Sequence, residues 1–213
     1  MGNIVQIAVV GGSGSGKTWL AEELCSALAP KATRLSLDDF YRDLSGMQRE
    51  DRSRVNFDEP AAIDWELVRG VLGALSRGEA AEIPSYDFTT HTRRSQPRLL
   101  TPQEFVIWDG LWLLHEAWLR KQFALSVYMD CAAGERLARR VARDVRERGR
   151  TLESVQRQFQ EQVEPMHFRH VEPQRRWATC CVASPANEQT LRRLLTRVRD
   201  VPQRTKVSAA RAR

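Results

Sequence analysis

The stretch "GGSGSGKT", from Gly11 to Thr18, directly follows the apolar run "IVQIAVV" at residues 4–10. It matches the pattern G-x-x-x-x-G-K-[ST], in which a glycine-rich turn joins a buried strand to a helix. The glycines let backbone N–H groups converge on phosphate oxygens, and the start of the helix adds partial positive charge. We therefore predict a phosphate-binding loop (P-loop) made of Gly11, Gly12, Ser13, Gly14, Ser15, Gly16, Lys17 and Thr18.

Three side chains are expected beside the bound phosphates. Lys17 would reach the β- and γ-phosphates of a nucleotide, and Thr18 would bind Mg²⁺ through its hydroxyl group. Asp109 ends the apolar stretch "VIWDG" at residues 106–110. In P-loop enzymes a carboxylate at a neighbouring strand end lies beside the magnesium ion, so we expect Asp109 there.

The rest of the chain alternates strand and helix patterns. Short apolar runs predict strands over 4–10, 33–40, 104–110, 125–130 and 177–184. Helical periodicity and helix-stop residues predict helices over 17–30, 59–78, 134–149, 151–163 and 187–199. This alternation predicts an α/β fold with a parallel sheet covered by helices on both faces. Residues 82–94, rich in Thr and aromatic side chains, are expected to form a β-hairpin or extended flap.

Length and composition bound the class of protein. The chain has 213 residues and a net charge of +6, which favours phosphate-rich partners such as nucleotides or nucleic acid. Its four cysteines show no C-x-x-C spacing, so we expect reduced thiols in a cytoplasmic protein without a membrane span. We expect one domain over 1–200 and a basic, disordered tail over 201–213.

Two other P-loop classes fit the sequence less well. A regulatory GTPase would need the guanine-reading pattern N-K-x-D, which the sequence lacks. A nucleic-acid binder would place aromatic residues among its arginines, and a helicase would need a second motor core. Neither feature is present, so a small-molecule kinase is the preferred class and nucleic acid is not an expected partner.

A second group of carboxylates follows the strand expected at 33–40. Asp38 and Asp39 lie near its end, at the sheet edge where ligands bind in open α/β folds. Successive strand residues alternate faces, so one of the two is expected to face the phosphates. A carboxylate there can accept the proton of an attacking hydroxyl group, as kinases require.

The helix expected at 134–149 has an apolar stripe and an arginine stripe. Leu137, Val141 and Val145 form the apolar stripe. The arginines fall at positions i, i+3, i+4 and i+7, and two more follow near the helix end: Arg136, Arg139, Arg140, Arg143, Arg148 and Arg150. Arginines that close over a transferred phosphate would neutralise its charge.

Over roughly residues 5–185 the chain resembles the uridine kinase (uridine–cytidine kinase) family of P-loop kinases. The resemblance rests on six blocks in order: "GGSGSGKT", "LSLDDFY", "NFDEPAAIDWELV", "IPSYDFTTHTRR", "VIWDG" and "RLARRVARDVRERGRTLESVQRQF". It implies a five-stranded parallel sheet with helices on both faces, a β-hairpin flap at about 82–94 and a helical lid at about 134–165. It also implies a homo-oligomer, a tetramer in this family.

The same resemblance implies roles for individual residues. Asp38 matches the base for the ribose 5′-hydroxyl group, and Asp58 matches the carboxylate that binds the 2′- and 3′-hydroxyl groups. Arg143 and Arg148 match lid residues that contact ATP phosphates. The flap residues expected around the pyrimidine are Tyr86, Phe88 and His91. The remaining residues expected on the substrate side are Arg140, Arg150 and Gln158.

The activity implied is transfer of phosphate from ATP, with Mg²⁺, to the 5′-hydroxyl group of uridine or cytidine. A related kinase of another small alcohol is an alternative: pantothenate, ribulose phosphate, glycerate or nicotinamide riboside. A non-catalytic P-loop protein is a second alternative, against which the intact Asp38 argues. The sequence departs from the family at Asp109, where Glu is common, and at "ASPANEQ" (183–189), so no residue is assigned to adenine recognition.

Overall fold

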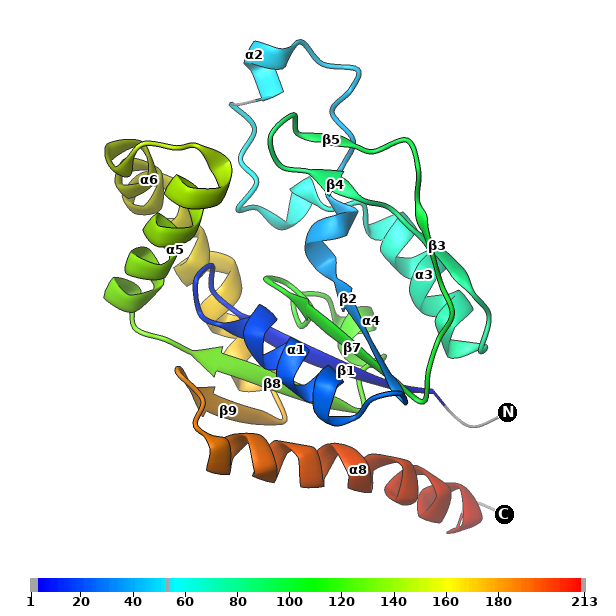
Figure 1. Cartoon of the computed structure of the whole chain (residues 1–213). Coiled ribbons are helices and arrows are strands. Elements are labelled where there is room, and N and C mark those ends of the chain that lie inside the picture. Colours follow the sequence, from blue (N-terminus) through cyan, green and yellow to red (C-terminus); the bar gives the residue numbers. More distant parts are fainter. Residues whose placement is uncertain (1–3, 53, 212–213) are drawn as a thin grey trace.

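The computed structural model describes residues 4–52 and 54–211, with the backbone alone for 202–211. Its central sheet has five parallel strands in the order β2–β7–β1–β8–β9. The strands are β1 (Val5–Gly11), β2 (Ala32–Ser36), β7 (Phe105–Gly110), β8 (Leu125–Asp130) and β9 (Cys180–Ala183). The predicted α/β fold with a five-stranded parallel sheet is therefore confirmed (Figure 1).

Strand register brings the chemically important strand ends to one edge of the sheet. In β1 and β7, Val9 pairs with Asp109, and in β2 and β7, Ser36 pairs with Asp109. The P-loop after β1 and the turn after β2 therefore leave the sheet next to Asp109. Ligands of open α/β sheets bind at this carboxyl edge.

Successive side chains of each strand point to opposite faces of the sheet, and a hydrophobic core lies on each face. Ile7 and Val9 pack with Leu24 of α1 (Lys17–Ala27) and Val198 of α8 (Glu188–Arg211). Ala8 and Val10 point to the other face, where the core includes α3 (Trp65–Ser76). Helices thus cover both faces, as expected for a parallel sheet buried on both sides (Figure 1).

A hairpin and a helical segment rise above the carboxyl edge of the sheet (Figure 1). In the hairpin, β4 (Tyr86–Asp87) pairs with β5 (Thr92–Arg93), and β3 (Ala81–Ile83) pairs with β6 (Arg98–Leu100). The helical segment begins with α5 (Ala133–Arg148) and α6 (Leu152–Gln158). It continues as η3 (Phe159–Val163), α7 (Glu164–Met166), η4 (His167–Val171) and η5 (Glu172–Trp177).

The inner face of α5 is charged. Val145, the last residue of the predicted apolar stripe, is 44% exposed and Leu137 and Val141 are half-buried, whereas Arg140 and Asp144 are buried. The reason is that α5 packs against the P-loop and α6 rather than on an apolar face of the sheet. Its inner face is charged because it borders a polar cavity, and two arginines of the predicted arginine stripe, Arg140 and Arg143, line that cavity.

Several element boundaries also differ from the predicted ones. β2 ends at Ser36, and the next residues form the 3₁₀ turn η1 (Leu37–Phe40). The helix expected at 59–78 is split into η2 (Pro60–Ala62) and α3, because Asp64 caps α3 by accepting from the Leu67 N–H at 3.1 Å. Short helices α2 (Arg49–Arg52) and α4 (Ala117–Arg120) lie in the connections.

The last helix, α8, continues past residue 199, where the sequence predicts its end. Its backbone is helical to Arg211, over most of the segment expected to be a disordered tail, and residues 212–213 lie outside the described part of the chain. The division into a domain over 1–200 and a tail over 201–213 stays a prediction. Within the described residues, the search for a helix long and apolar enough to cross a bilayer finds none.

Candidate active site

The P-loop joins β1 to α1 and lies directly against α5. Gly14 has φ 78°, and a Cβ atom at this position would lie 2.3 Å from the carbonyl oxygen of Arg136. Both the left-handed backbone and this close approach require glycine. The loop backbone and α5 are therefore in contact, which holds the side chains of α5 beside the phosphate-binding backbone.

Lys17 is the first residue of α1 and its side chain is buried. Burial lowers the pKa of its ammonium group, while the nearby carboxylates of Asp38 and Asp109 act in the opposite direction. Phosphate oxygens entering the site would favour the charged ammonium group in the same way. The position and environment of Lys17 therefore suit a group that binds an anion.

Thr18 and Asp109 lie together at the carboxyl edge of the sheet. The Thr18 hydroxyl group donates to Oδ2 of Asp109 at 2.8 Å, and Nε of Arg34 donates to Oδ1 at 2.9 Å. Asp109 is 1% exposed, so these two partners account for both of its oxygens. Hydroxyl and carboxylate oxygens are ligands that Mg²⁺ prefers, and this donor set could hold the ion.

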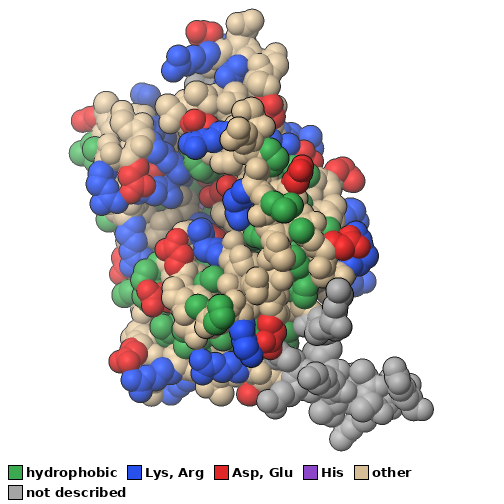
Figure 2. All heavy atoms as spheres, turned by 45° about the vertical axis from the view of Figure 1, so that its right-hand side comes forward, with side chains coloured by type: hydrophobic (Ala, Val, Ile, Leu, Met, Phe, Trp, Pro, Cys, Tyr) green, Lys and Arg blue, Asp and Glu red, His purple; other side chains and the backbone are tan. Residues whose placement is uncertain are grey.

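A cavity opens between the P-loop, η1, the hairpin and the lid helices. In Figure 2 basic side chains gather around a hollow on the corresponding side of the molecule. The cavity is lined by Ser13, Lys17, Asp38, Tyr41, Val55, Phe57, Asp58, Phe88, Thr89, His91, Leu111, Arg140, Arg143, Arg148, Arg150 and Gln158. Its walls thus carry five basic side chains against two carboxylates, a balance that favours an anionic ligand.

Asp38 and Asp39, both in η1, point to different surroundings. Asp38 lines the cavity, and Asp39 lies 3.5 Å from the guanidinium group of Arg98. Oδ1 of Asp38 is buried without a hydrogen-bond partner among the described residues. Asp38 is therefore the carboxylate available to a ligand, although it sits on a 3₁₀ turn and not at the end of a strand.

Asp58 is a buried carboxylate that lines the same cavity. Burial raises the pKa of Asp58, and the charges of Asp38 and Asp144 act in the same direction, while Arg140 opposes them. Its backbone N–H donates to Oδ1 of Asn56 at 3.0 Å, which fixes the turn that carries it. A buried carboxylate that faces a cavity can accept hydrogen bonds from two adjacent hydroxyl groups.

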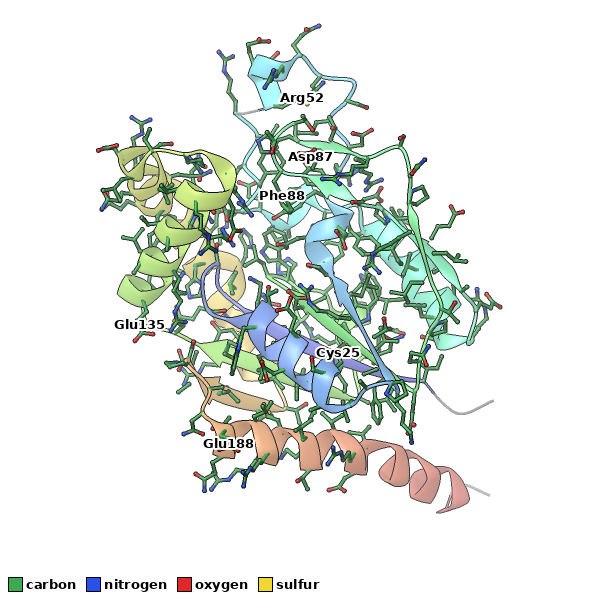
Figure 3. The ribbon with its side chains drawn as sticks, in the orientation of Figure 1. Cys25, Arg52, Asp87, Phe88, Glu135 and Glu188 are labelled. Carbon is green, nitrogen blue, oxygen red and sulfur yellow. The ribbon has the colours of Figure 1, made fainter. Side chains whose placement is uncertain are left out.

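The hairpin contributes Phe88 and His91 to the cavity. The ring of His91 stacks on Phe57 with centroids 4.4 Å apart and planes at 14°. Its backbone has φ 56°, and burial, followed by the charge of Arg148, lowers the pKa of the imidazole. Figure 3 places Phe88 on the side of the hairpin that faces α5, where Arg148 lies 4.7 Å from its ring centroid.

Tyr86, also expected beside the base, lies behind the cavity wall. It is 5% exposed and packs against Tyr41 and Phe88, each at a centroid distance of 5.3 Å. In this structure Tyr86 supports the ring that faces the cavity and does not itself line it.

The lid contributes arginines that are already tied to the P-loop and to α6. Arg140 donates to the Ser13 hydroxyl group at 2.9 Å and to the Gln158 side-chain oxygen at 2.9 Å. Arg150 donates to the same Gln158 oxygen. Arg143 and Arg148 line the cavity and also contact Asp144. The four lid arginines expected to contact ligands therefore all lie at one cavity.

Sequence reasoning did not assign four residues that shape the site. Tyr41 and Phe57 line the cavity, and the Tyr41 hydroxyl group donates to the Phe57 carbonyl oxygen at 3.0 Å. Both stand inside quoted blocks, "LSLDDFY" and "NFDEPAAIDWELV", which could have singled them out. Arg34 and Asp144 do not line the cavity but contact residues of the site, Asp109 and Arg143 respectively. No sequence pattern indicates these contacts.

The parallel sheet, the P-loop, the carboxylates at its edge and the arginine-bearing lid define a P-loop kinase. The chain belongs to the phosphoribulokinase/uridine kinase family, whose model matches residues 6–190. Membership of this family implies the use of a nucleotide as phosphate donor.

Two relatives show how far the similarity extends. A uridine kinase from Deinococcus deserti is 40% identical over 91% of this chain and 94% of its own length. A uridine kinase from Halobacterium salinarum is 37% identical over 85% of this chain and 80% of its own length. The similarity therefore includes the P-loop, the hairpin and the lid.

Among solved structures, a putative fructose transport system kinase from Silicibacter sp. TM1040 is similar to this chain. It superposes with a TM-score of 0.72 at 22% identity, over 85% of this chain and 90% of its own. The phosphoribulokinase of Rhodobacter spheroides has a TM-score of 0.65 at 14% identity, over 85% and 70% of the two chains. These structures share the fold.

Proposed function

We propose that this enzyme phosphorylates the 5′-hydroxyl group of uridine or cytidine, with ATP as donor and Mg²⁺ as the accompanying ion. The observation that carries the proposal is the single cavity at which Lys17, Asp38, Asp58 and the lid arginines meet. It offers one end to phosphates and the other to a ribose and a flat base. The uridine kinases similar to this chain support the choice of acceptor.

At the donor end, the P-loop N–H groups and Lys17 bind the β- and γ-phosphates. Arg143 and Arg148 approach from the lid and neutralise charge on the transferred group. Thr18 and Asp109 would hold Mg²⁺ through hydroxyl and carboxylate oxygens, which the structure places 2.8 Å apart. The ion would neutralise phosphate charge.

At the acceptor end, Asp58 accepts hydrogen bonds from the ribose 2′- and 3′-hydroxyl groups, and Arg150, Arg140 and Gln158 complete the ribose side. Phe88 stacks on the base, and His91 binds its 4-substituent, since an imidazole can donate at one nitrogen and accept at the other. Tyr86 acts from behind by fixing Phe88.

In the transfer step the 5′-oxygen forms a bond to the γ-phosphorus atom. The bond from that phosphorus to the β,γ-bridging oxygen breaks, and ADP leaves. Asp38 orients the 5′-hydroxyl group and takes its proton. Closure of the lid over the cavity excludes water, which would otherwise compete as acceptor.

A coupled ADP-release assay with ATP, Mg²⁺ and a panel of acceptors tests this function. The panel contains uridine, cytidine, a purine nucleoside, thymidine, pantothenate, glycerate, ribulose phosphate and nicotinamide riboside. We expect turnover with uridine or cytidine alone. Turnover confined to another acceptor would contradict the proposed roles of Asp58 and the hairpin while leaving the P-loop chemistry in place. The tetrameric state implied by the resemblance and the cytoplasmic location expected from the cysteines stay predictions.

A further inference from the structure

Asp144 of α5 is a fully buried carboxylate enclosed by the lid arginines. Its side chain is 0% exposed, and Nε of Arg143 donates to its Oδ1 at 2.8 Å. Arg148 lies 3.5 Å from the same oxygen, and Nε of Arg140 lies 3.5 Å from Oδ2. One carboxylate therefore contacts three of the arginines that line the cavity.

The location of Asp144 excludes a direct role toward a ligand. It is not among the cavity-lining residues, whereas its three arginine partners are. Burial alone would raise the pKa of Asp144, but the hydrogen bond and charge of Arg143 and the charge of Arg148 outweigh burial and lower it. The carboxylate is thus ionised, and it acts on the cavity only through its arginine partners.

The three arginines depend on Asp144 to different degrees. Arg140 is also held by Ser13 and Gln158, at 2.9 Å each. Arg143 contacts Asp144 through Nε, so that bond uses neither of its two terminal nitrogens. A guanidinium group has five N–H donors in a rigid fork, so it can bind a carboxylate on one side and a phosphate on another.

The lid arginines repel one another, so a negative charge between them is needed to hold them close together. Arg140, Arg143 and Arg148 lie within about two turns of one helix, and like charges at this spacing drive flexible side chains apart into water. A buried carboxylate on the same helix offsets the repulsion without occupying the cavity. The guanidinium group of Arg148 lies 4.7 Å from the ring centroid of Phe88 and 3.5 Å from Asp144. Of these two contacts, only the one with Asp144 offsets its positive charge.

We propose that Asp144 is a positioning residue that holds Arg143 and Arg148 in the arrangement that receives the donor phosphates. The inference deepens the proposed function and rests on the phosphate-binding role given there to these two arginines. It predicts that the negative charge of Asp144 controls affinity for the donor and much less the affinity for the nucleoside.

The test compares Asp144→Asn with the wild type and with Glu147→Gln, an exposed acidic residue of the same helix that pairs with Arg146. Affinity for inorganic tripolyphosphate is measured by titration calorimetry, which needs no turnover. KM values for ATP and uridine are measured separately. We expect Asp144→Asn to weaken tripolyphosphate binding and raise the KM for ATP by about tenfold or more, because a buried charge partner is lost. The KM for uridine should change much less, and Glu147→Gln should match the wild type.

A folded Asp144→Asn protein that binds tripolyphosphate as tightly as the wild type would overturn the proposal, as would equal losses for ATP and uridine. If Asp144→Asn does not fold, Asp144→Glu keeps the charge but displaces it, and it should show the same selective loss for the donor in milder form. In an Arg143→Ala background, Asp144→Asn should cost less affinity than in the wild type; full additivity would contradict action through Arg143. Wild-type inactivity toward uridine, with tripolyphosphate still bound, would instead count against the proposed acceptor.

Discussion

At the scale of single residues, two adjacent carboxylates of η1 allow a matched test of the catalytic base. Asp38 lines the cavity, and Asp39 pairs with Arg98 outside it. Asp38→Asn should lower turnover by about 10²–10⁴-fold, the usual contribution of a positioned general base. Binding of a non-hydrolysable ATP analogue should persist. Asp39→Asn should remain close to wild type in kcat; equal losses in the two variants would refute the assignment.

The raised pKa of Asp58 predicts how the acceptor affinity depends on pH. In the proposed function, hydroxyl groups of the ribose donate to the ionised carboxylate, and that form is lost as the pH falls through the pKa. Because burial raises this pKa, the KM for uridine should begin to increase at a higher pH than an ordinary aspartate would give. Asp58→Asn should raise the KM by roughly 10–100-fold at neutral pH. Asp58→Asn should also remove the increase in the KM for uridine at low pH. If the variant still shows that increase, another group is responsible for it.

Much of the site at this scale could be predicted from the sequence. The P-loop, Asp38 and Asp109 follow from their motif and from their places after predicted strands, and Asp58 follows from the family resemblance. Lys17, Asp38 and Asp58 line one cavity, and Asp109 is paired in register with the P-loop strand. Asp144 could not be found in this way. Its importance depends on three partners and on complete burial, and the same letters would describe an exposed residue of a charged helix.

At the scale of elements, the hairpin positions a histidine through a strained backbone and an aromatic stack. His91 has φ 56° and lies against Phe57. Asn tolerates the left-handed region, so His91→Asn shortens the side chain while keeping the turn. We expect a changed ratio of kcat/KM for uridine and cytidine in this variant. Thr90→Ala, at the tip of the same hairpin, should leave the ratio unaltered. If both ratios equal that of the wild type, His91 does not read the base.

The lid has its own conformational requirement at the end of α5. Gly149 caps the helix with φ 62°, and a Cβ atom there would meet open space, so substitution introduces backbone strain without a clash. Gly149→Ala should lower the free energy of unfolding by about 1 kcal/mol. Gly70→Ala, in the middle of α3 and also in open space, should raise it by about 1 kcal/mol. Urea denaturation measures both, and changes of the same sign would contradict the explanation.

The charged inner face of α5 shows what periodicity leaves open at this scale. The pattern located the helix to within a residue or two, but an apolar stripe predicts the buried face only when the neighbour is an apolar core. Here the neighbours are the P-loop and a polar cavity, so Arg140 and Asp144 are buried and Val145 is exposed. The strand order β2–β7–β1–β8–β9 was likewise beyond the sequence pattern, because crossover connections decide which strands become neighbours.

At the scale of the whole molecule, the cavity is walled by the P-loop, η1, the hairpin and the lid, which come from separate parts of the chain. Ligands bound there link these elements, and a ligand that binds only the folded state stabilises it by RT ln(1 + [L]/Kd). At a concentration one hundred times its Kd, a non-hydrolysable ATP analogue should therefore raise the free energy of unfolding by about 2.7 kcal/mol. Uridine should do the same at its own hundredfold excess.

One variant tests whether donor and acceptor bind to different parts of the cavity. Lys17, Asp58 and the hairpin residues all line the cavity. In the proposed function Lys17 binds the donor phosphates, and Asp58 and the hairpin bind the acceptor. Lys17→Ala should therefore lose most of the stabilisation by the ATP analogue and retain that by uridine, as measured by thermal unfolding with each ligand. Retention of both shifts would mean that Lys17 contributes little to donor binding, and loss of both would mean that donor and acceptor sites are not independent. The first pattern alone is consistent with a cavity divided between a phosphate end, built on the P-loop and lid, and a nucleoside end, built on Asp58 and the hairpin.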